Sequence, residues 1–383
     1  MSDPIFYNGR GTPEMYDDLM DFMNYVFGFN GNDSDFKKLL PKLYRPECDP
    51  CYNNYVVTEN GKLKAAIGAF DSVLKVSEEE LTCRGIGNVA VHPYSRSKGY
   101  MKDCMKLALD GMIADGVDYS ILGGIRQRYN HFGYETSGPA YRVEISARDL
   151  NYNFDRKGIP FVELDLHTVT AADTELLDKM YAIHATRPLR TVRSREQFLD
   201  ICNSWRSPAY AILKDGQFRG YFVGGLQELT LVDENDFVDV VRNYVRHHGK
   251  VSMHFAAWET DHMEKAAAIG SAPTMDYSDM YSIFNYKKVV SAFLRFKASY
   301  TDLADGEISV KINGFAKEEK LLIYVENGTP YVEEHSGDCD IELGHLEAAT
   351  FFFGLYSPAW TKVPAAARGW FPLPLYVDNA DHV

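Results

Sequence analysis

The feature that most constrains this chain is a strand that enters a helix through a short loop rich in proline, arginine and glycine. Residues 88–102 read N-V-A-V-H-P-Y-S-R-S-K-G-Y-M-K. Val91 ends a run with strand character, and apolar side chains then recur at helical spacing. The free N–H groups at a helix start form an anion site, and a glycine such as Gly99 lets a phosphate approach the backbone closely. Arg96 and Lys98 add positive charge. The segment therefore predicts a pyrophosphate-binding loop.

A second glycine pattern overlaps this segment. Gly85-Ile86-Gly87-Asn88-Val89-Ala90 matches the dinucleotide pattern G-x-G-x-x-G/A. That motif requires the glycines to follow a strand and open a helix. Here the run continues as a strand until Pro93. The glycines are therefore expected inside a strand, which argues against a nicotinamide or flavin site.

Hydrophobic periodicity predicts a mixed α/β fold for the N-terminal third. A helix is expected over residues 14–29, and Asn60-Gly61 predicts the turn of a hairpin. Strands are expected over residues 55–58, 63–70, 72–76, 82–91 and 119–125, and a second helix over residues 101–112. The order strand, helix, strand around residues 82–125 predicts a crossover between parallel strands.

The pattern of predicted strands and helices begins again near residues 149 and 286, so we place domain boundaries there. Residues 150–285 mix strands with helices and lack a second R-x-x-G helix entry. Their predicted strands are 210–213, 220–224 and 251–256, and their predicted helices are 172–185 and 236–247. Residues 286–383 begin with a predicted helix over 287–296, continue with strand-rich sequence, and include a predicted helix over 348–356.

Composition excludes several classes of protein. The 383 residues include 40 Lys and Arg against 54 Asp and Glu, a formal charge of −14. Such a chain is a poor nucleic-acid binder; the acidity favours cationic ligands, or it simply maintains solubility. No basic and apolar leader opens the sequence, and no run approaches a membrane span. Six cysteines do not make a disulfide scaffold. A cytoplasmic protein with no membrane partner is expected.

One cysteine pair needs separate consideration. Cys48 and Cys51 form a C-x-x-C, but no second pair of ligands follows at the spacing of a zinc site. We therefore expect two ordinary thiols in a loop and no metal.

The segment from Val89 to Met101 resembles the acetyl-CoA motif of GNAT acetyltransferases, whose core is [QR]-x-x-G-x-[GA]. Arg96 and Gly99 match this core, whereas Met101 stands where Gly or Ala is usual. Tyr129 to Thr136, Y-N-H-F-G-Y-E-T, resembles the [YR]-F-G-[YF] segment of the enhanced intracellular survival (Eis) family. This second resemblance covers essentially the whole chain. It implies a catalytic GNAT domain at 1–149, a degenerate GNAT-like domain without cofactor at 150–285, and a sterol-carrier-protein-like α/β domain at 286–383.

The resemblance also implies a mechanism: direct acetyl transfer from acetyl-CoA to a primary amine of a small cationic molecule, such as an aminoglycoside or a polyamine. Tyr134 would be the general acid, and the carboxylate of Val383 would be the general base. The terminal sequence W-F-P-L-P-L-Y-V-D-N-A-D-H-V would carry that carboxylate back to the active site. The family is commonly hexameric. The implied cofactor contacts are Val89, Ala90, Val91, Arg96, Ser97, Lys98, Gly99, Tyr100, Met101 and Lys102.

Other interpretations remain open at the level of sequence. The chain could acetylate protein lysines, or it could carry lipid or act as a scaffold through residues 286–383. Tyr134 could be a packed aromatic, Val383 a frayed end and Arg96 a solvated charge. The acids and aromatics of the first helix either line an acceptor pocket or belong to an ordinary amphipathic helix: Asp17, Asp18, Asp21, Phe22, Tyr25, Phe27 and Phe29.

Overall fold

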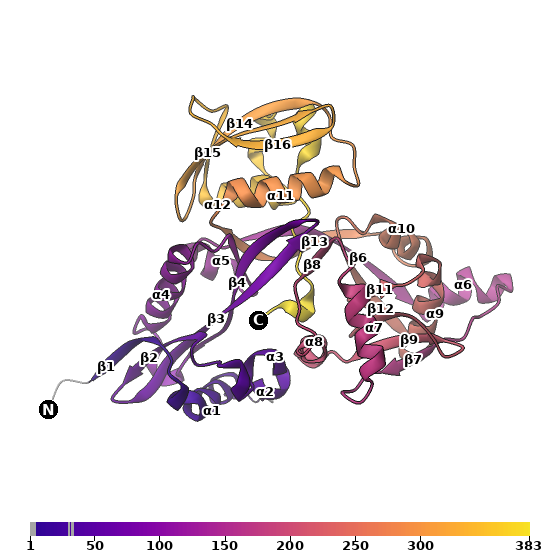
Figure 1. Ribbon diagram of the computed structural model, residues 1–383, viewed down its shortest axis with the longest axis horizontal. Helices are drawn as coiled ribbons and strands as arrows, with labels where there is room; N and C mark the ends of the chain where they lie inside the picture. Colours follow the sequence, from indigo (N-terminus) through magenta and orange to yellow (C-terminus); the bar gives the residue numbers. More distant parts are fainter. Residues whose placement is uncertain (1–4, 30, 32–33) are drawn as a thin grey trace.

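The computed structural model describes residues 5–29, 31 and 34–383. Three lobes surround the C-terminus, which lies between the N-terminal and middle lobes (Figure 1). The described strands form three sheets, of nine, four and four strands, and helices cover them. The predicted α/β class with mixed sheets is confirmed.

The largest sheet has the order β1-β2-β3-β4-β5-β13-β6-β12, and β8 pairs with β3 outside this path. Its strands are β1 (Phe6–Arg10), β2 (Asn54–Glu59), β3 (Lys62–Val76), β4 (Glu79–Val91), β5 (Tyr119–Leu122), β6 (Glu135–Ser146), β8 (Leu189–Thr191), β12 (Lys250–Ala256) and β13 (Thr274–Ile283). Strands β4 and β5 pair in parallel. Helix α4 (Tyr100–Ala114) connects them, which confirms the predicted crossover.

The first hairpin differs from expectation in one respect. Asn60 and Gly61 both have positive φ, 53° and 73°, as a type I′ turn requires. The predicted strands 63–70 and 72–76 are one strand, β3. Asp71 interrupts the run of apolar residues, but the strand continues through it. Asp71 pairs with Arg84 of the neighbouring strand β4, and its exposed carboxylate accepts a hydrogen bond from the Arg84 side chain.

The first two lobes share the large sheet. The predicted boundary at residue 149 lies within α6 (Ala147–Asn153), yet β8, β12 and β13 return from beyond it to pair with β3, β6 and β5. A strand pattern does not specify its pairing partner, so the sequence could not predict this exchange. The second sheet has the order β11-β10-β9-β7: β7 (Asp165–Thr168), β9 (Ala209–Lys214), β10 (Gln217–Val223) and β11 (Glu228–Leu231).

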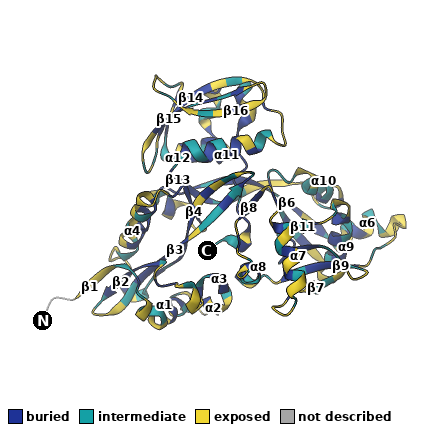
Figure 2. Ribbon diagram, in the orientation of Figure 1, coloured by how far each residue is buried: buried dark blue, intermediate teal, exposed yellow. Residues whose placement is uncertain are grey.

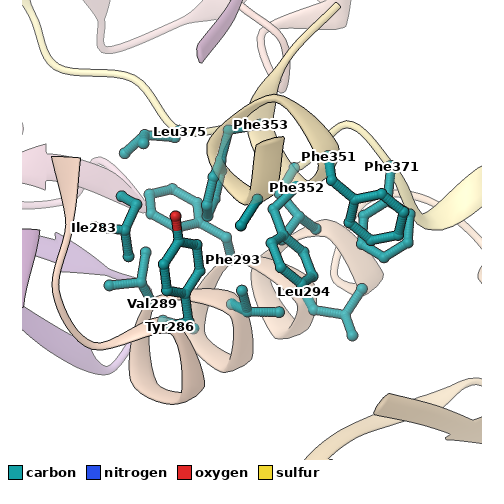
Figure 3. Close-up of a cluster of buried hydrophobic side chains, with 14 of the residues drawn as sticks. Ile283, Tyr286, Val289, Phe293, Leu294, Phe351, Phe352, Phe353, Phe371 and Leu375 are labelled. Atoms are coloured by element: carbon teal, nitrogen blue, oxygen red, sulfur yellow. The ribbon is translucent and has the colours of Figure 1, made fainter. Parts of the chain in front are cut away.

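The third lobe begins at α11 (Tyr286–Ala298). Its sheet has the order β16-β15-β14-β17: β14 (Gly306–Asn313), β15 (Glu318–Glu326), β16 (Thr329–Glu334) and β17 (Ile341–Gly344). The helix predicted over 348–356 is α12 (His345–Phe353), which Gly354 ends. Phenylalanines of both helices pack with Ile283 of the large sheet and with Phe371 and Leu375 of the C-terminal segment (Figure 3). The terminal segment is therefore part of a shared core.

The remaining helices lie around these sheets. They are α1 (Tyr16–Gly28), α2 (Phe36–Leu39), α3 (Pro41–Tyr44), α5 (Arg126–Tyr129), α7 (Thr174–His184), α8 (Phe198–Cys202), α9 (Phe237–His248) and α10 (Thr260–Ile269). Buried residues follow the strands, and exposed residues gather on outer elements such as α6 (Figure 2). Among the described helices, none has the length and apolar character needed to cross a bilayer.

Candidate active site

A β-bulge in β4 determines which side chains face the site. The register changes between the pairs Ala66↔Ala90 and Gly68↔Gly87, so β4 contains one more residue than β3 here. Asn88 has φ 41°, and its side-chain oxygen Oδ1 accepts a hydrogen bond from the Tyr44 hydroxyl at 2.6 Å. A bulge reverses the alternation of side chains along a strand. Val89 therefore packs on the same side of the sheet as Ile86, while Ala90 packs on the opposite side.

Beyond the bulge, β4 and β5 separate. Their pairing ends at Ile86↔Leu122, whereas β4 continues to Val91. A cleft of about 1120 Å³ lies beside this gap. Its walls come from the end of β4, the start of α4, Val26 of α1 and the segment after β5: Val26, Val89, Val91, Ser95, Arg96, Ser97, Gly99, Tyr100, Met101, Lys102, Ile125, Gln127, Arg128, His131 and Phe132.

The start of α4 opens into this cleft. Gly99 is the N-cap with φ 90°, and no side chain in the described part of the chain caps the helix by a hydrogen bond. A glycine in this left-handed conformation brings the backbone close to a ligand without a Cβ in the way. The main-chain N–H groups of the first turn and the positive end of the helix dipole therefore face the cleft.

The charge of the cleft is opposite to that of the whole chain. Arg96, Lys102 and Arg128 line it, and no Asp or Glu does so among the described residues. The chain as a whole carries a formal charge of −14. A cationic, acid-free wall at a helix start suits a phosphorylated ligand. This donor set fits the diphosphate of coenzyme A, and the apolar side chains of Val89 and Val91 suit its pantetheine arm.

Two of the ten predicted cofactor contacts do not line the cleft. Ala90 is buried on the far side of the bulge, against α1. Lys98 extends toward β2, where its ammonium lies 3.5 Å from the Glu59 carboxylate. The other eight residues line the cleft together.

Tyr134 lies immediately before β6 and is completely buried. Its hydroxyl lies 2.7 Å from the Ser120 hydroxyl, which donates a hydrogen bond to the Arg84 carbonyl of β4 at 2.5 Å. The ring packs in the same apolar cluster as Val89, although it is not part of the cleft wall. Burial raises the pKa of Tyr134, and the Ser120 hydroxyl opposes this shift. The phenol therefore keeps its proton at neutral pH.

Val383 lies against β4. Its carboxyl carbon is 2.8 Å from the position that a Cβ on Gly87 would occupy, and its side chain lies equally close to that position on Gly85. It packs in the cluster that also contains Phe22 of α1 and Ala90. The glycines of the G-x-G-x-x-A run are therefore strand residues, as the sequence predicts, and they leave space for the C-terminus.

Several residues of this region were not identified from the sequence. Gln127, Arg128 and His131 follow β5 and reach the cleft because the strands diverge there. Gln127 and Arg128 precede the Y-N-H-F-G-Y segment and His131 lies within it, which was the available signal. Ser120 carried no signal, because a single serine in a short apolar strand has no distinctive pattern.

The two cysteines of the C-x-x-C are free thiols, and Cys48 is half-buried. Cys51 is buried, which raises its thiol pKa to about 11. In the described part of the chain, no group of three or more His, Cys, Asp or Glu side chains is arranged to hold a metal ion.

Comparison with known proteins identifies the class of the N-terminal domain. Residues 10–137 match the acetyltransferase (GNAT) domain family. The whole chain superposes on a GCN5-related N-acetyltransferase from Anabaena variabilis ATCC 29413 with a TM-score of 0.68 and 15% identity, covering 99% of this chain and 100% of the other. No curated protein matches the sequence. The match gives the chain a GNAT acetyltransferase domain over residues 10–137, which include every residue that lines the cleft.

Two further structures extend the similarity. A conserved protein from Enterococcus faecalis V583, described as a probable N-acyltransferase, superposes with a TM-score of 0.66 at 15% identity, over 99% of this chain and 100% of the other. Eis1 from Mycobacterium abscessus superposes with a TM-score of 0.64 at 11% identity, over the same shares. At these identities the comparison shows a shared fold over the whole chain. GNAT domains use acetyl-CoA as the acetyl donor.

Proposed function

We propose that this chain is an Eis-like enzyme that transfers an acetyl group from acetyl-CoA to a primary amine of a small cationic molecule. The observation that carries the proposal is the cleft at the start of α4, because it is lined by Arg96, Lys102 and Arg128 and by no carboxylate of the described chain. The full-length similarity to Eis1 supports the choice of family. Bound acetyl-CoA would supply a thioester whose carbonyl carbon accepts the amine.

The roles of the protein groups follow from their chemistry. The main-chain N–H groups at Gly99 to Met101 and the Arg96 guanidinium would hold the diphosphate. An amine is protonated at neutral pH and must lose a proton before it can attack, so the Val383 carboxylate would receive that proton directly or through water. The Tyr134 hydroxyl would donate a proton to the departing thiolate. Burial keeps the Tyr134 hydroxyl protonated at neutral pH, as a proton donor must be.

We propose that the acceptor enters along α1. Asp17, Asp21 and Tyr25 are exposed and lie four residues apart, so they share one face of the helix. The Tyr25 ring lies 5.5 Å from His92 at the end of β4. Carboxylates attract an amine cation, and aromatic faces bind it by cation–π contact. This surface adjoins Val26 in the cleft wall and Phe22, which packs with Val383.

The cofactor proposal is tested by calorimetric titration with acetyl-CoA. Arg96→Gln is expected to weaken binding about tenfold or more, because a charge-assisted hydrogen bond is lost. Lys98→Gln is the matched control, since Lys98 pairs with Glu59, and it is expected to change the dissociation constant less than about twofold. Equal effects of the two variants would contradict the assigned diphosphate site.

The acceptor proposal is tested by thiol release from acetyl-CoA with kanamycin, spermidine and a lysine peptide. We expect turnover with kanamycin or spermidine. Asp21→Asn is expected to increase the KM for that amine, whereas the control Asp110→Asn, on the outer face of α4, is expected to leave it unchanged. Turnover with the lysine peptide alone would favour protein acetylation. No turnover with any of them, together with no thermal shift by acetyl-CoA, would leave the lipid-carrier or scaffold alternative.

The assembly and location are proposed on the resemblance alone. We propose a cytoplasmic homo-oligomer, with a hexamer as the specific expectation. Light scattering of the purified protein measures the mass in solution directly.

A further inference from the structure

The last residues of the chain are held by a group of buried charges from other parts of the fold. Arg193 follows β8 and donates paired hydrogen bonds to Asp381 at 2.9 and 2.8 Å, and to Glu228 of β11 at 2.9 and 2.7 Å. The side chains of Arg193, Glu228 and Asp381 are 0%, 2% and 4% exposed. Arg187 pairs in the same way with Asp378, at 2.6 and 3.2 Å. We call Arg193, Glu228 and Asp381 the ion triad.

Neighbouring tail residues have separate anchors. Lys42 of α3 donates a hydrogen bond to the Ala380 carbonyl at 2.5 Å. The indole of Trp205 donates one to the His382 carbonyl at 3.2 Å. His382 also lies 3.3 Å from the Asp279 carboxylate of β13. Each of the residues from Ala380 to His382 is therefore fixed by a contact with a different segment of the chain.

Stability alone does not account for the ion triad. The tail already buries Leu373, Leu375 and Val377 in the apolar core. A buried ion pair loses much of its Coulomb energy to desolvation, so it contributes little net stability, whereas a shifted register would leave its charges unpaired. Paired, bidentate contacts between planar groups also specify orientation. The geometry of the triad therefore suits a role in specifying where the tail ends.

We propose that Arg193 and Asp381 are positioning residues for acetyl transfer, which hold the Val383 carboxylate over Gly87 of β4. This inference rests on the proposed function, in which that carboxylate is the general base. Two residues span at most about 7 Å, so fixing Asp381 closely restricts the position of the terminal carboxylate. The middle lobe, which supplies Arg193 and Glu228, thereby contributes to a reaction carried out in the N-terminal lobe.

A double-mutant cycle tests this coupling. Asp381→Asn is expected to lower kcat about tenfold or more with an unchanged KM for acetyl-CoA, because a small displacement of a reacting group is costly. In a chain that lacks Val383 and so ends in the His382 carboxylate, the same substitution is expected to change kcat less than about twofold, since the Val383 carboxylate that it positions is absent. The control is Asp236→Asn in the middle lobe, a buried aspartate that pairs with Arg219 at 2.6 Å and is not part of the triad.

Lys42→Met provides a second route if Asp381→Asn does not fold. It removes the donor to the Ala380 carbonyl and a positive charge that interacts with Asp381, while Arg193, Glu228 and Asp381 all remain, and it is expected to give the same pattern of effects. A loss of kcat that is equal in the full and shortened chains, or no loss at all, would overturn the positioning role. If the shortened chain were fully active, the Val383 carboxylate would not be the base, and the inference would fail while acetyl transfer stood. Absence of turnover in the wild-type chain would instead contradict the proposed function itself.

Discussion

Replacing Gly87 with alanine is expected to displace the C-terminal carboxylate and to slow catalysis without weakening acetyl-CoA binding. A Cβ on Gly87 would lie 2.8 Å from the carboxyl carbon of Val383 and 3.1 Å from a carboxyl oxygen. Ordinary carbon–carbon contacts are about 3.5–4.0 Å, so the terminus must move by about 1 Å. A misplacement of that size can cost about 100-fold in rate. We therefore expect kcat to fall about 10- to 100-fold.

Gly85→Ala is the matched control on the same strand. Its Cβ would meet a methyl group of Val383 at 2.7 Å, and that methyl can move by rotation of the side chain. We expect kcat within about threefold of wild type, because rotation leaves the carboxylate in place. The assay is steady-state thiol release at saturating amine, with acetyl-CoA affinity measured separately. A wild-type kcat for Gly87→Ala, or equal losses in both variants, would refute the assigned role of the carboxylate.

Two further predictions concern the residues near Tyr134. Tyr134→Phe is expected to lower kcat about 100-fold or more with little change in the KM for acetyl-CoA, because a general acid is lost and the diphosphate contacts remain. A wild-type kcat in the same thiol-release assay would show that Tyr134 is a packing residue. His345 predicts a pH dependence of stability. Its ring lies 2.7 Å from the Gly133 carbonyl and accepts a hydrogen bond from the Phe315 N–H, and burial lowers its pKa from 6.5 to about 4. As the pH falls, the unfolded chain therefore binds a proton at His345 at a higher pH than the folded chain does. The contribution of His345 to the free energy of unfolding is full above pH 6.5 and is lost by about pH 4, a loss of about 3 kcal/mol. Urea unfolding of wild type and His345→Gln at pH 7 and pH 4 measures the difference, and parallel losses in the two chains would contradict it.

Local signals in the sequence predicted the elements of the N-terminal lobe well. The Asn60-Gly61 turn, helix α4 and the parallel crossover depend on residues close together in the chain. The glycine at the helix start and Arg96 identified the cleft for the same reason. These features follow from backbone conformation and periodicity, which short windows of sequence contain.

Long-range pairing could not be predicted in the same way. The return of β12 and β13 to the large sheet depends on which edges and faces are free in three dimensions. The buried positions of Arg187 and Arg193 could not be recognised either, because an arginine in sequence is expected at the surface. The tail offered a partial signal, since Asp378 and Asp381 interrupt a segment that is otherwise apolar. Their arginine partners lie about 190 residues earlier, at separations of 191 and 188 residues.

The structure of the protein with coenzyme A bound tests the central claim most directly. The account predicts that the diphosphate oxygens accept hydrogen bonds from main-chain N–H groups at the start of α4, with the Arg96 guanidinium beside them and the pantetheine arm along Val89 and Val91. Coenzyme A bound in another part of the molecule, or a diphosphate remote from residues 96–102, would contradict it.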